Sequence, residues 1–135
     1  MSDYYIGIMT GNSMDAVDMV YATVDENGIR PIYTFSQPFS GQMQSDIAQL
    51  RADVKLCKSR NDVLQLPRFR AIHDAYIHQI ADAVCQFIAD NQIPLETLKA
   101  ICSHGKTLDH CPPSLNALSP YTLQIGPGNI VADTI

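Results

Sequence analysis

The hydrophobic positions near the start of the chain fall into three short runs separated by polar turns. The runs cover residues 4–9, 19–24 and about 30–36, and runs of this length bounded by polar residues are typical of β-strands. Residues 25–28 join the last two runs and end in an Asn-Gly pair of the kind that closes β-hairpins. The chain is therefore predicted to open with an antiparallel β-meander.

The hydrophobic spacing after the third run changes to three and four residues, which indicates a helix. Ser40 can cap a short helix in which Met43, Ile47 and Leu50 share one face. The polar stretch at residues 51–62 contains few apolar positions, so we expect a flexible surface loop there.

A second and longer helical pattern begins at Pro67 and ends near Asn91. Its apolar residues recur every three or four positions, so this helix is predicted to be amphipathic and to pack across a sheet. They are Phe69, Ile72, Tyr76, Ile80, Val84, Phe87 and Ile88.

Two further strands are predicted in the last third of the chain. Residues 99–103 would return parallel to an earlier strand through a helical crossover, and residues 121–125 would form the final strand. Residues 130–135 look like the first turns of a helix. The predicted fold class is α/β: residues 1–135 form a single domain with a mixed sheet of about five strands, an antiparallel meander plus parallel strands, and helices on its face.

The composition and charge of the chain limit the kinds of molecule that it could bind. The chain is 46% hydrophobic and 17% charged, and its net charge of −5 leaves no basic stripe for nucleic acid. No apolar segment is long enough for a membrane span and no signal peptide is recognised, so we expect a cytoplasmic protein that binds a small molecule. The four cysteines form no CxxC pair, which favours reduced thiols, with Cys85 and Cys102 expected in the core.

The polar turn after the first strand is the first candidate site. Gly7 and Gly11 allow close approach of a ligand to the backbone, and the Ser13 hydroxyl and Asp15 carboxylate could face a phosphate or its metal ion. This chemistry suits nucleotide phosphate binding. An ordinary polar hairpin turn is the alternative, because short glycine motifs often occur without function.

A second polar cluster, residues 103–107 followed by His110, lies just past the strand predicted at 99–103. Open α/β sheets place their ligands at such strand ends, and His104, beside Gly105, could hydrogen-bond a sugar hydroxyl. The alternative is a polar loop that only caps the strand.

Two other chemistries also stay open from the residues alone. Cys102, His104, His110 and Cys111 are residue types that bind zinc, although their spacing lacks the paired clips of structural sites. The turn at Ser13 also resembles the nucleophilic serine of Gly-Asp-Ser esterases, which would need a partner histidine.

Three motifs together resemble one family. They are Gly7-x-Met9-x-Gly-x-Ser-x-Asp15-x-x-Asp18, then Ser103-His-Gly105-x-Thr107-x-x-His110-x-Pro112, and last Thr122-Leu-Gln-Ile-Gly126. In this order and at these separations they resemble the anhydro-N-acetylmuramic acid kinases. The resemblance covers the whole chain, and the chain looks like the first third of a family member.

The resemblance implies a ribonuclease H-like first domain of the actin, sugar kinase and Hsp70 fold, incomplete in these residues. It implies ATP and Mg²⁺ as cofactors, and phosphorylation of 1,6-anhydro-N-acetylmuramic acid with hydrolytic opening of the anhydro ring, in cell-wall recycling. The ATP phosphates and magnesium would be bound by Gly11, Asn12, Ser13, Met14, Asp15 and Asp18, with Asp15 facing the metal through water. The amino sugar would be bound by Ser103, His104, Gly105, Lys106, Thr107 and Gln124.

The chain differs from the usual family pattern at Asn12, Ala16 and Lys106. Ala16 would be strained by about 1 kcal/mol if its position required a positive φ. The catalytic aspartate of the family would lie beyond residue 135, so we expect the 135 residues to be inactive alone. A truncated or diverged non-catalytic relative is the alternative. The apolar positions in residues 130–135 predict self-association, for example as a homodimer.

Overall fold

The computed structural model describes residues 3–11, 15–58, 60–111 and 121–125. The three N-terminal runs form the predicted antiparallel strands, β1 (Asp3–Thr10), β2 (Ala16–Asp25) and β3 (Gly28–Pro38). The turn between β2 and β3 has the expected chemistry, because Gly28 has a φ of +118° and the Asp25 carboxylate accepts from the Asn27 N–H at 2.8 Å. The predicted β-meander is confirmed.

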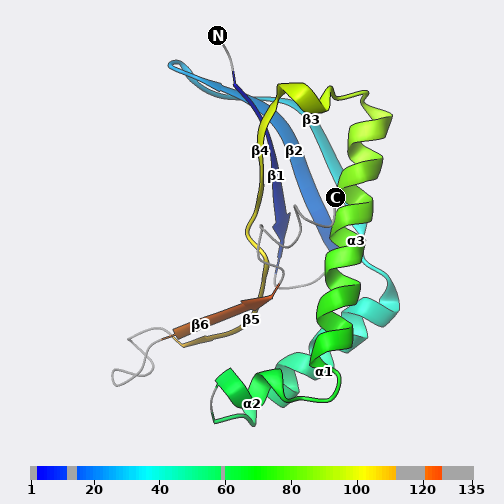
Figure 1. Ribbon diagram of the computed structural model, residues 1–135, viewed down its shortest axis with the longest axis vertical. Coiled ribbons are helices and arrows are strands. Elements are labelled where there is room, and N and C mark those ends of the chain that lie inside the picture. The colour runs from blue at the N-terminus through cyan, green and yellow to red at the C-terminus, as the bar shows by residue number, and fades with distance from the viewer. Residues whose placement is uncertain (1–2, 12–14, 59, 112–120, 126–135) are drawn as a thin grey trace.

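The strand β4 (Leu98–Ser103) follows a short 3₁₀ turn, η1 (Leu95–Thr97), and lies parallel to β1. The main sheet therefore has the order β3-β2-β1-β4, with the predicted parallel return through a helix (Figure 1). Ala16 begins β2 in ordinary extended backbone, since Gln92 is the one non-glycine residue with positive φ in the described part of the chain. The strain considered for Ala16 is thus not present.

The prediction of about five strands in one sheet is wrong. The main sheet has four strands, and β5 (Lys106–Cys111) and β6 (Tyr121–Ile125) pair with each other in a separate antiparallel ribbon (Figure 1). Gly105, with a φ of +80°, redirects the chain directly after β4, so β5 leaves the sheet. The sequence predicts no strand at residues 106–111, because most of these residues are polar and such a stretch is typical of a loop.

The helices are α1 (Gly41–Lys55), α2 (Arg60–Leu64) and α3 (Phe69–Asp90). The long helix predicted from residue 67 to near Asn91 is confirmed as α3, and Asn91 is its C-terminal cap. The flexible loop expected at residues 51–62 is wrong in most of its length. Val54 lies one turn beyond Leu50 and is buried, so α1 continues to Lys55, and α2 begins five residues later.

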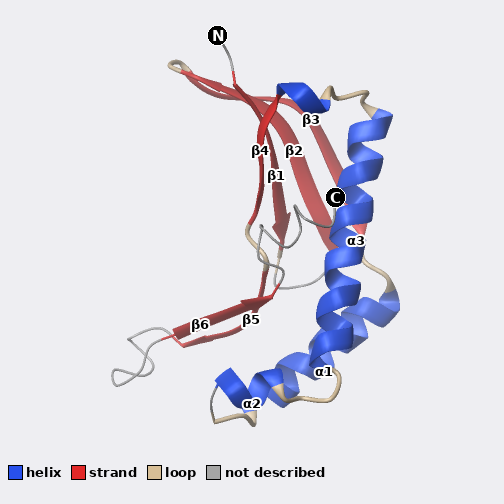
Figure 2. Cartoon of the chain, viewed as in Figure 1, coloured by secondary structure: helices blue, strands red, loops and turns tan. Residues whose placement is uncertain are grey.

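The core lies between α3, α1 and one face of the main sheet, and Figure 2 shows α3 running alongside the strands. Ile6 and Ile8 of β1 and Met19 of β2 are buried on that face. The Phe87 ring of α3 lies 5.8 Å from the ring of Phe35 on β3. The cysteines predicted in the core are instead exposed, Cys85 on α3 and Cys102 on β4, and both are free thiols.

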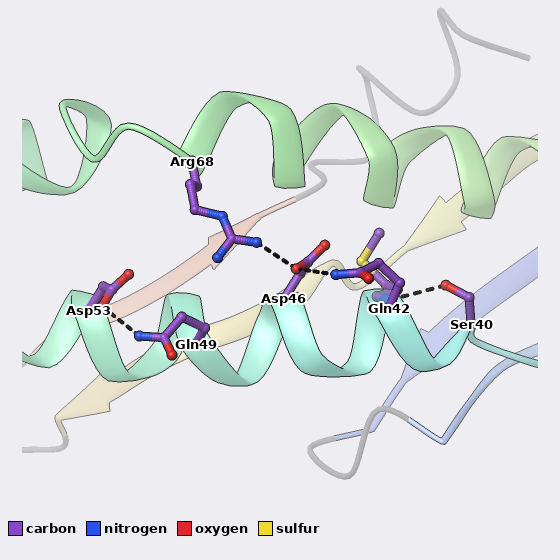
Figure 3. A network of polar contacts seen from close by, with 7 residues as sticks. Ser40, Gln42, Asp46, Gln49, Asp53 and Arg68 are labelled. Atoms are coloured by element: carbon purple, nitrogen blue, oxygen red, sulfur yellow. Dashed lines mark hydrogen bonds and ion pairs between the residues drawn. The ribbon is translucent and has the colours of Figure 1, made fainter.

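Polar side chains cap the N-terminus of α1 and bind this helix to the residue that precedes α3 (Figure 3). Ser40 caps α1 as predicted, its Oγ accepting from the Met43 N–H at 3.1 Å. One turn on, Asp46 accepts from Gln42 at 2.8 Å and forms an ion pair with Arg68 at 2.7 Å. Because Arg68 is more than half exposed, this pair adds little stability, about 0–1 kcal/mol.

Replacing Ser40 with alanine is expected to lower the free energy of unfolding by about 1 kcal/mol, because the Met43 N–H loses its acceptor. Urea denaturation measures the loss. Ser45→Ala is the matched control, since Ser45 is exposed inside α1 and alanine favours a helix. Equal stability of Ser40→Ala and the unaltered chain would show that the cap contributes nothing.

Candidate functional site

The two segments predicted to bind ligands lie side by side in the structure. Because β1 and β4 are parallel, both end at the same edge of the sheet, with Ile8 paired to Ser103. The His104 N–H continues this pairing by donating to the Ile8 carbonyl at 3.3 Å. The predicted phosphate turn, which begins at Gly11, and the predicted sugar segment, residues 103–107, therefore leave the sheet together.

Side chains join these two segments just past the strand ends. The Thr10 hydroxyl donates to the Gly105 carbonyl at 3.2 Å, and the same hydroxyl lies 3.0 Å from the hydroxyl of Tyr76 on α3. The Lys106 ammonium donates to the Gly11 carbonyl at 2.9 Å. We call Thr10, Gly11, Tyr76, Gly105 and Lys106 the strand-end latch.

The sequence did not indicate Tyr76 as part of a site, nor its contact with Thr10. Thr10 ends a strand, and Tyr76 falls on the apolar face of α3, where it looks like an ordinary core residue. The Tyr76 hydroxyl is the one feature of the sequence that could have indicated this contact. A tyrosine hydroxyl on a buried helix face needs a hydrogen-bond partner. Burial raises the pKa of the Tyr76 hydroxyl above its ordinary value of 10.0, and the hydrogen bond to Thr10 offsets part of that rise.

Replacing Tyr76 with phenylalanine is expected to cost about 1 kcal/mol of stability at pH 7, through loss of the bond to Thr10. Because the folded pKa is raised, the unfolded chain releases the phenol proton first. The stability that Tyr76 contributes is thus full below pH 10 and is lost as the pH rises through its folded pKa.

The difference in unfolding free energy between the unaltered chain and Tyr76→Phe should therefore shrink above pH 10, as urea denaturation across pH 7 to 11 would show. Tyr33→Phe serves as the control because Tyr33 is 43% exposed. A constant difference at all pH values would contradict the assignment.

A broad hollow of about 860 Å³ lies on the sheet face opposite α3. Successive strand residues point to opposite faces, so Ile8 and Met19 enter the core while Met9 and Asp18, paired across β1 and β2, face the hollow. The lining residues are Gly7, Ile8, Met9, Asp18, Met19, Val20, Thr34, Phe35, Ser36, Cys102, Ser103 and His104.

The hollow brings together residues from both predicted sites. Asp18, predicted for the nucleotide, and Ser103 and His104, predicted for the sugar, share its lining. The sequence did not indicate the contribution of β3, Thr34 to Ser36, because strand order is needed to place it beside β2.

For the other predicted site residues, the structure gives backbone contacts only, or does not describe the residue. Asp15 is exposed, and its carbonyl accepts from the Phe39 N–H at 3.1 Å, which holds the end of the phosphate turn against the chain that follows β3. Thr107 and Gln124, both predicted for the sugar, are directly paired between β5 and β6. Asn12, Ser13 and Met14 lie outside the described residues, as does the helix predicted at 130–135.

The zinc alternative gains no support from the described side chains. Cys102 and His104 are both exposed, and no three potential metal ligands cluster among the side chains that the structure describes. The side chains of His110 and Cys111 are not among them. The nucleophile of the esterase alternative, Ser13, is not described either.

The fold and the site together define an α/β protein whose polar segments gather at the carboxyl ends of two parallel strands. The family model for anhydro-N-acetylmuramic acid kinase matches residues 3–135. The chain therefore belongs to the anhydro-N-acetylmuramic acid kinase family. No helix within the described ranges has the length and apolar character needed to cross a membrane.

Two bacterial relatives are similar along nearly the whole chain. An anhydro-N-acetylmuramic acid kinase of Photobacterium profundum is 37% identical over 128 residues, which is 95% of this chain and 31% of the relative. One from Sulfurimonas denitrificans is 30% identical over 131 residues, 97% of this chain and 32% of the relative. The chain spans about a third of the length of these relatives.

Proposed function

We propose that this chain is the N-terminal part of an ATP-dependent kinase that phosphorylates 1,6-anhydro-N-acetylmuramic acid and opens its anhydro ring with water. The product would be N-acetylmuramic acid 6-phosphate, formed in the cytoplasm during cell-wall recycling. The observation that carries the proposal is the direct contact between residues 10–11 and residues 105–106, because it joins a segment predicted to bind phosphate to one predicted to bind the sugar.

The two subsites in this proposal follow the sequence segments. The ATP phosphates would be bound by Gly11, Asn12, Ser13, Met14, Asp15 and Asp18. The amino sugar would be bound by Ser103, His104, Gly105 and Thr107, with Gln124 beside Thr107 on β6. His104 and Ser103 already line the hollow, so polar groups for sugar hydroxyls are available there.

The residues present fit a magnesium ion carried by a nucleotide. Asp15 offers an exposed carboxylate on a backbone held by Phe39, and Mg²⁺ is usually bound by one or two carboxylates together with substrate phosphates and water. When bound, the ion would neutralise charge that develops on the transferring phosphoryl group. Asp15 would hold the ion through water.

We expect the 135 residues alone to bind ligands without turning them over. Phosphoryl transfer requires positioning and charge stabilisation from several sides at once, and the resemblance puts the catalytic aspartate beyond residue 135. A non-catalytic relative would share the fold but would not bind ATP or the anhydro sugar. Ligand binding therefore distinguishes the N-terminal part of a kinase from a non-catalytic relative.

The proposal is tested by titrating the chain with Mg²⁺-ATP and, separately, with the anhydro sugar while recording amide NMR spectra. We expect Mg²⁺-ATP to shift Gly11 and Asp15, and the sugar to shift Ser103 and His104. A chimera that carries residues 3–135 in place of the matched third of the Photobacterium profundum relative should release ADP only when the sugar is present. Absence of both binding and sugar-dependent ADP release would favour the non-catalytic alternative.

A further inference from the structure

Lys106 has no exposed surface, although it is a charged residue at the start of β5. Its ammonium donates to the Gly11 carbonyl, 95 residues earlier in the chain, at 2.9 Å. Burying a charged group is costly unless it is hydrogen-bonded, and the Gly11 carbonyl supplies Lys106 with an acceptor, so the contact constrains the carbonyl as well as the lysine. The Lys106 side chain therefore points to the first residue after β1.

A second contact of the strand-end latch joins residues with the same separation along the chain. Thr10 is bound to Gly105, also 95 residues away, and Gly11 is bound to Lys106, so two consecutive residues face two consecutive residues. Thr10 is held in turn by Tyr76, which is 1% exposed. Leu108, two residues beyond Lys106 in β5, is also buried and anchors that strand in the core. The contact at Gly105 before it and the burial of Leu108 after it thus hold Lys106 in place.

We propose that Lys106 is a positioning residue that fixes Gly11 at the start of the nucleotide turn, and that it does not contact the sugar. This inference rests on the proposed function for the assignment of Gly11 to the nucleotide. The peptide unit is planar, so holding the Gly11 carbonyl toward the protein interior fixes the whole unit that follows it. A pre-set orientation saves the nucleotide the cost of ordering that backbone when it binds.

The electrostatics of Lys106 agree with this role. Burial, and secondarily the positive charge of Arg51 on α1, hold the pKa of Lys106 below its ordinary value of 10.5. The charged form is therefore costly at this position, and the hydrogen bond to the Gly11 carbonyl offsets part of that cost. A lysine that bound sugar hydroxyls would keep its ammonium at the surface of the site.

The test replaces Lys106 with methionine, which keeps the aliphatic stem and removes the donor. Lys99→Met is the matched control, because Lys99 is exposed on β4. In the ligand-free chain we expect Lys106→Met to move the ¹³C resonance of the Gly11 carbonyl and Lys99→Met to leave it unchanged. In titrations, Lys106→Met should weaken Mg²⁺-ATP binding by about three- to tenfold, the worth of one hydrogen bond, and leave sugar affinity unchanged.

Two further variants keep the test decisive if Lys106→Met does not fold. Lys106→Arg retains a charged donor and should preserve both the carbonyl resonance and Mg²⁺-ATP affinity. Lys106→Gln offers a neutral amide on a shorter stem, which would serve a sugar contact but reach the Gly11 carbonyl poorly. We therefore expect Lys106→Gln to weaken nucleotide binding and spare sugar binding.

The outcomes separate the two proposals. Loss of sugar affinity with unchanged nucleotide affinity, or an unmoved Gly11 carbonyl resonance in Lys106→Met and Lys106→Gln, overturns the positioning role. If the unaltered chain binds neither ligand, the proposed function fails, and a moved Gly11 resonance would then show a latch that serves the fold alone. That result also overturns the positioning role.

Discussion

Phe87→Ala is expected to lower the free energy of unfolding by about 3–5 kcal/mol. Phe87 has no exposed surface, and its ring packs 5.8 Å from that of Phe35, so truncation leaves a cavity between α3 and the sheet. Whole domains are stable by only about 5–15 kcal/mol, so most of the margin would be lost. Chemical denaturation followed by circular dichroism gives the change in unfolding free energy.

Gln86→Ala, next to Phe87 on the exposed side of α3, is the control and should change stability by less than about 0.5 kcal/mol. Phe87→Leu, which fills more of the cavity, should fall between the control and alanine. A loss for Phe87→Ala no larger than that of the control would mean that α3 does not pack on the sheet as described.

Asp15→Asn is expected to weaken Mg²⁺-ATP binding at least tenfold, about 1.4 kcal/mol. The substitution keeps the side-chain size and the backbone bond to Phe39 while it removes the charge that attracts the ion. Because the loss comes from the metal, the affinity for ATP measured with magnesium chelated should not fall. Calorimetric titration in the two conditions measures both affinities.

Asp82→Asn provides the control, since Asp82 is an exposed aspartate on α3, away from the strand ends. It should bind Mg²⁺-ATP like the unaltered chain. If Asp15→Asn and Asp82→Asn bind Mg²⁺-ATP equally well, Asp15 does not face the metal, and the proposed phosphate subsite has to be placed elsewhere.

Much of the fold could be predicted because its signals are local. The hairpin of β2 and β3 follows from Asn27 and Gly28, and α3 follows from apolar residues spaced by three and four. The end of α1 was predicted too early, because Val54 is one apolar residue in a polar stretch, and only its burial shows that the helix continues. The strand β5 was missed for a similar reason, since Lys106 and His110 are typical of a loop.

The candidate site was predictable as two segments, and the side-chain contacts that join them were not. The glycine, hydroxyl and carboxylate pattern of residues 11–18 and the Ser-His-Gly run at 103–105 indicate ligand chemistry by residue type. Nothing in either segment indicates Tyr76, whose hydroxyl comes from α3, or the contribution of β3 to the hollow. Lys106 was placed in the sugar segment by sequence, and the structure directs its ammonium to Gly11.

The sequence by itself determined the strands of the meander, the amphipathic α3, the family of the chain and the two polar segments. Each of these depends on residues that are neighbours along the chain. The tertiary structure alone decided that β5 pairs with β6 outside the main sheet, that a hollow opens opposite α3, and that Lys106 is buried against Gly11. These features depend on contacts between residues as much as 95 positions apart along the chain. The parallel pairing of β1 with β4 places the two strand ends at one edge of the sheet, where such residues can meet.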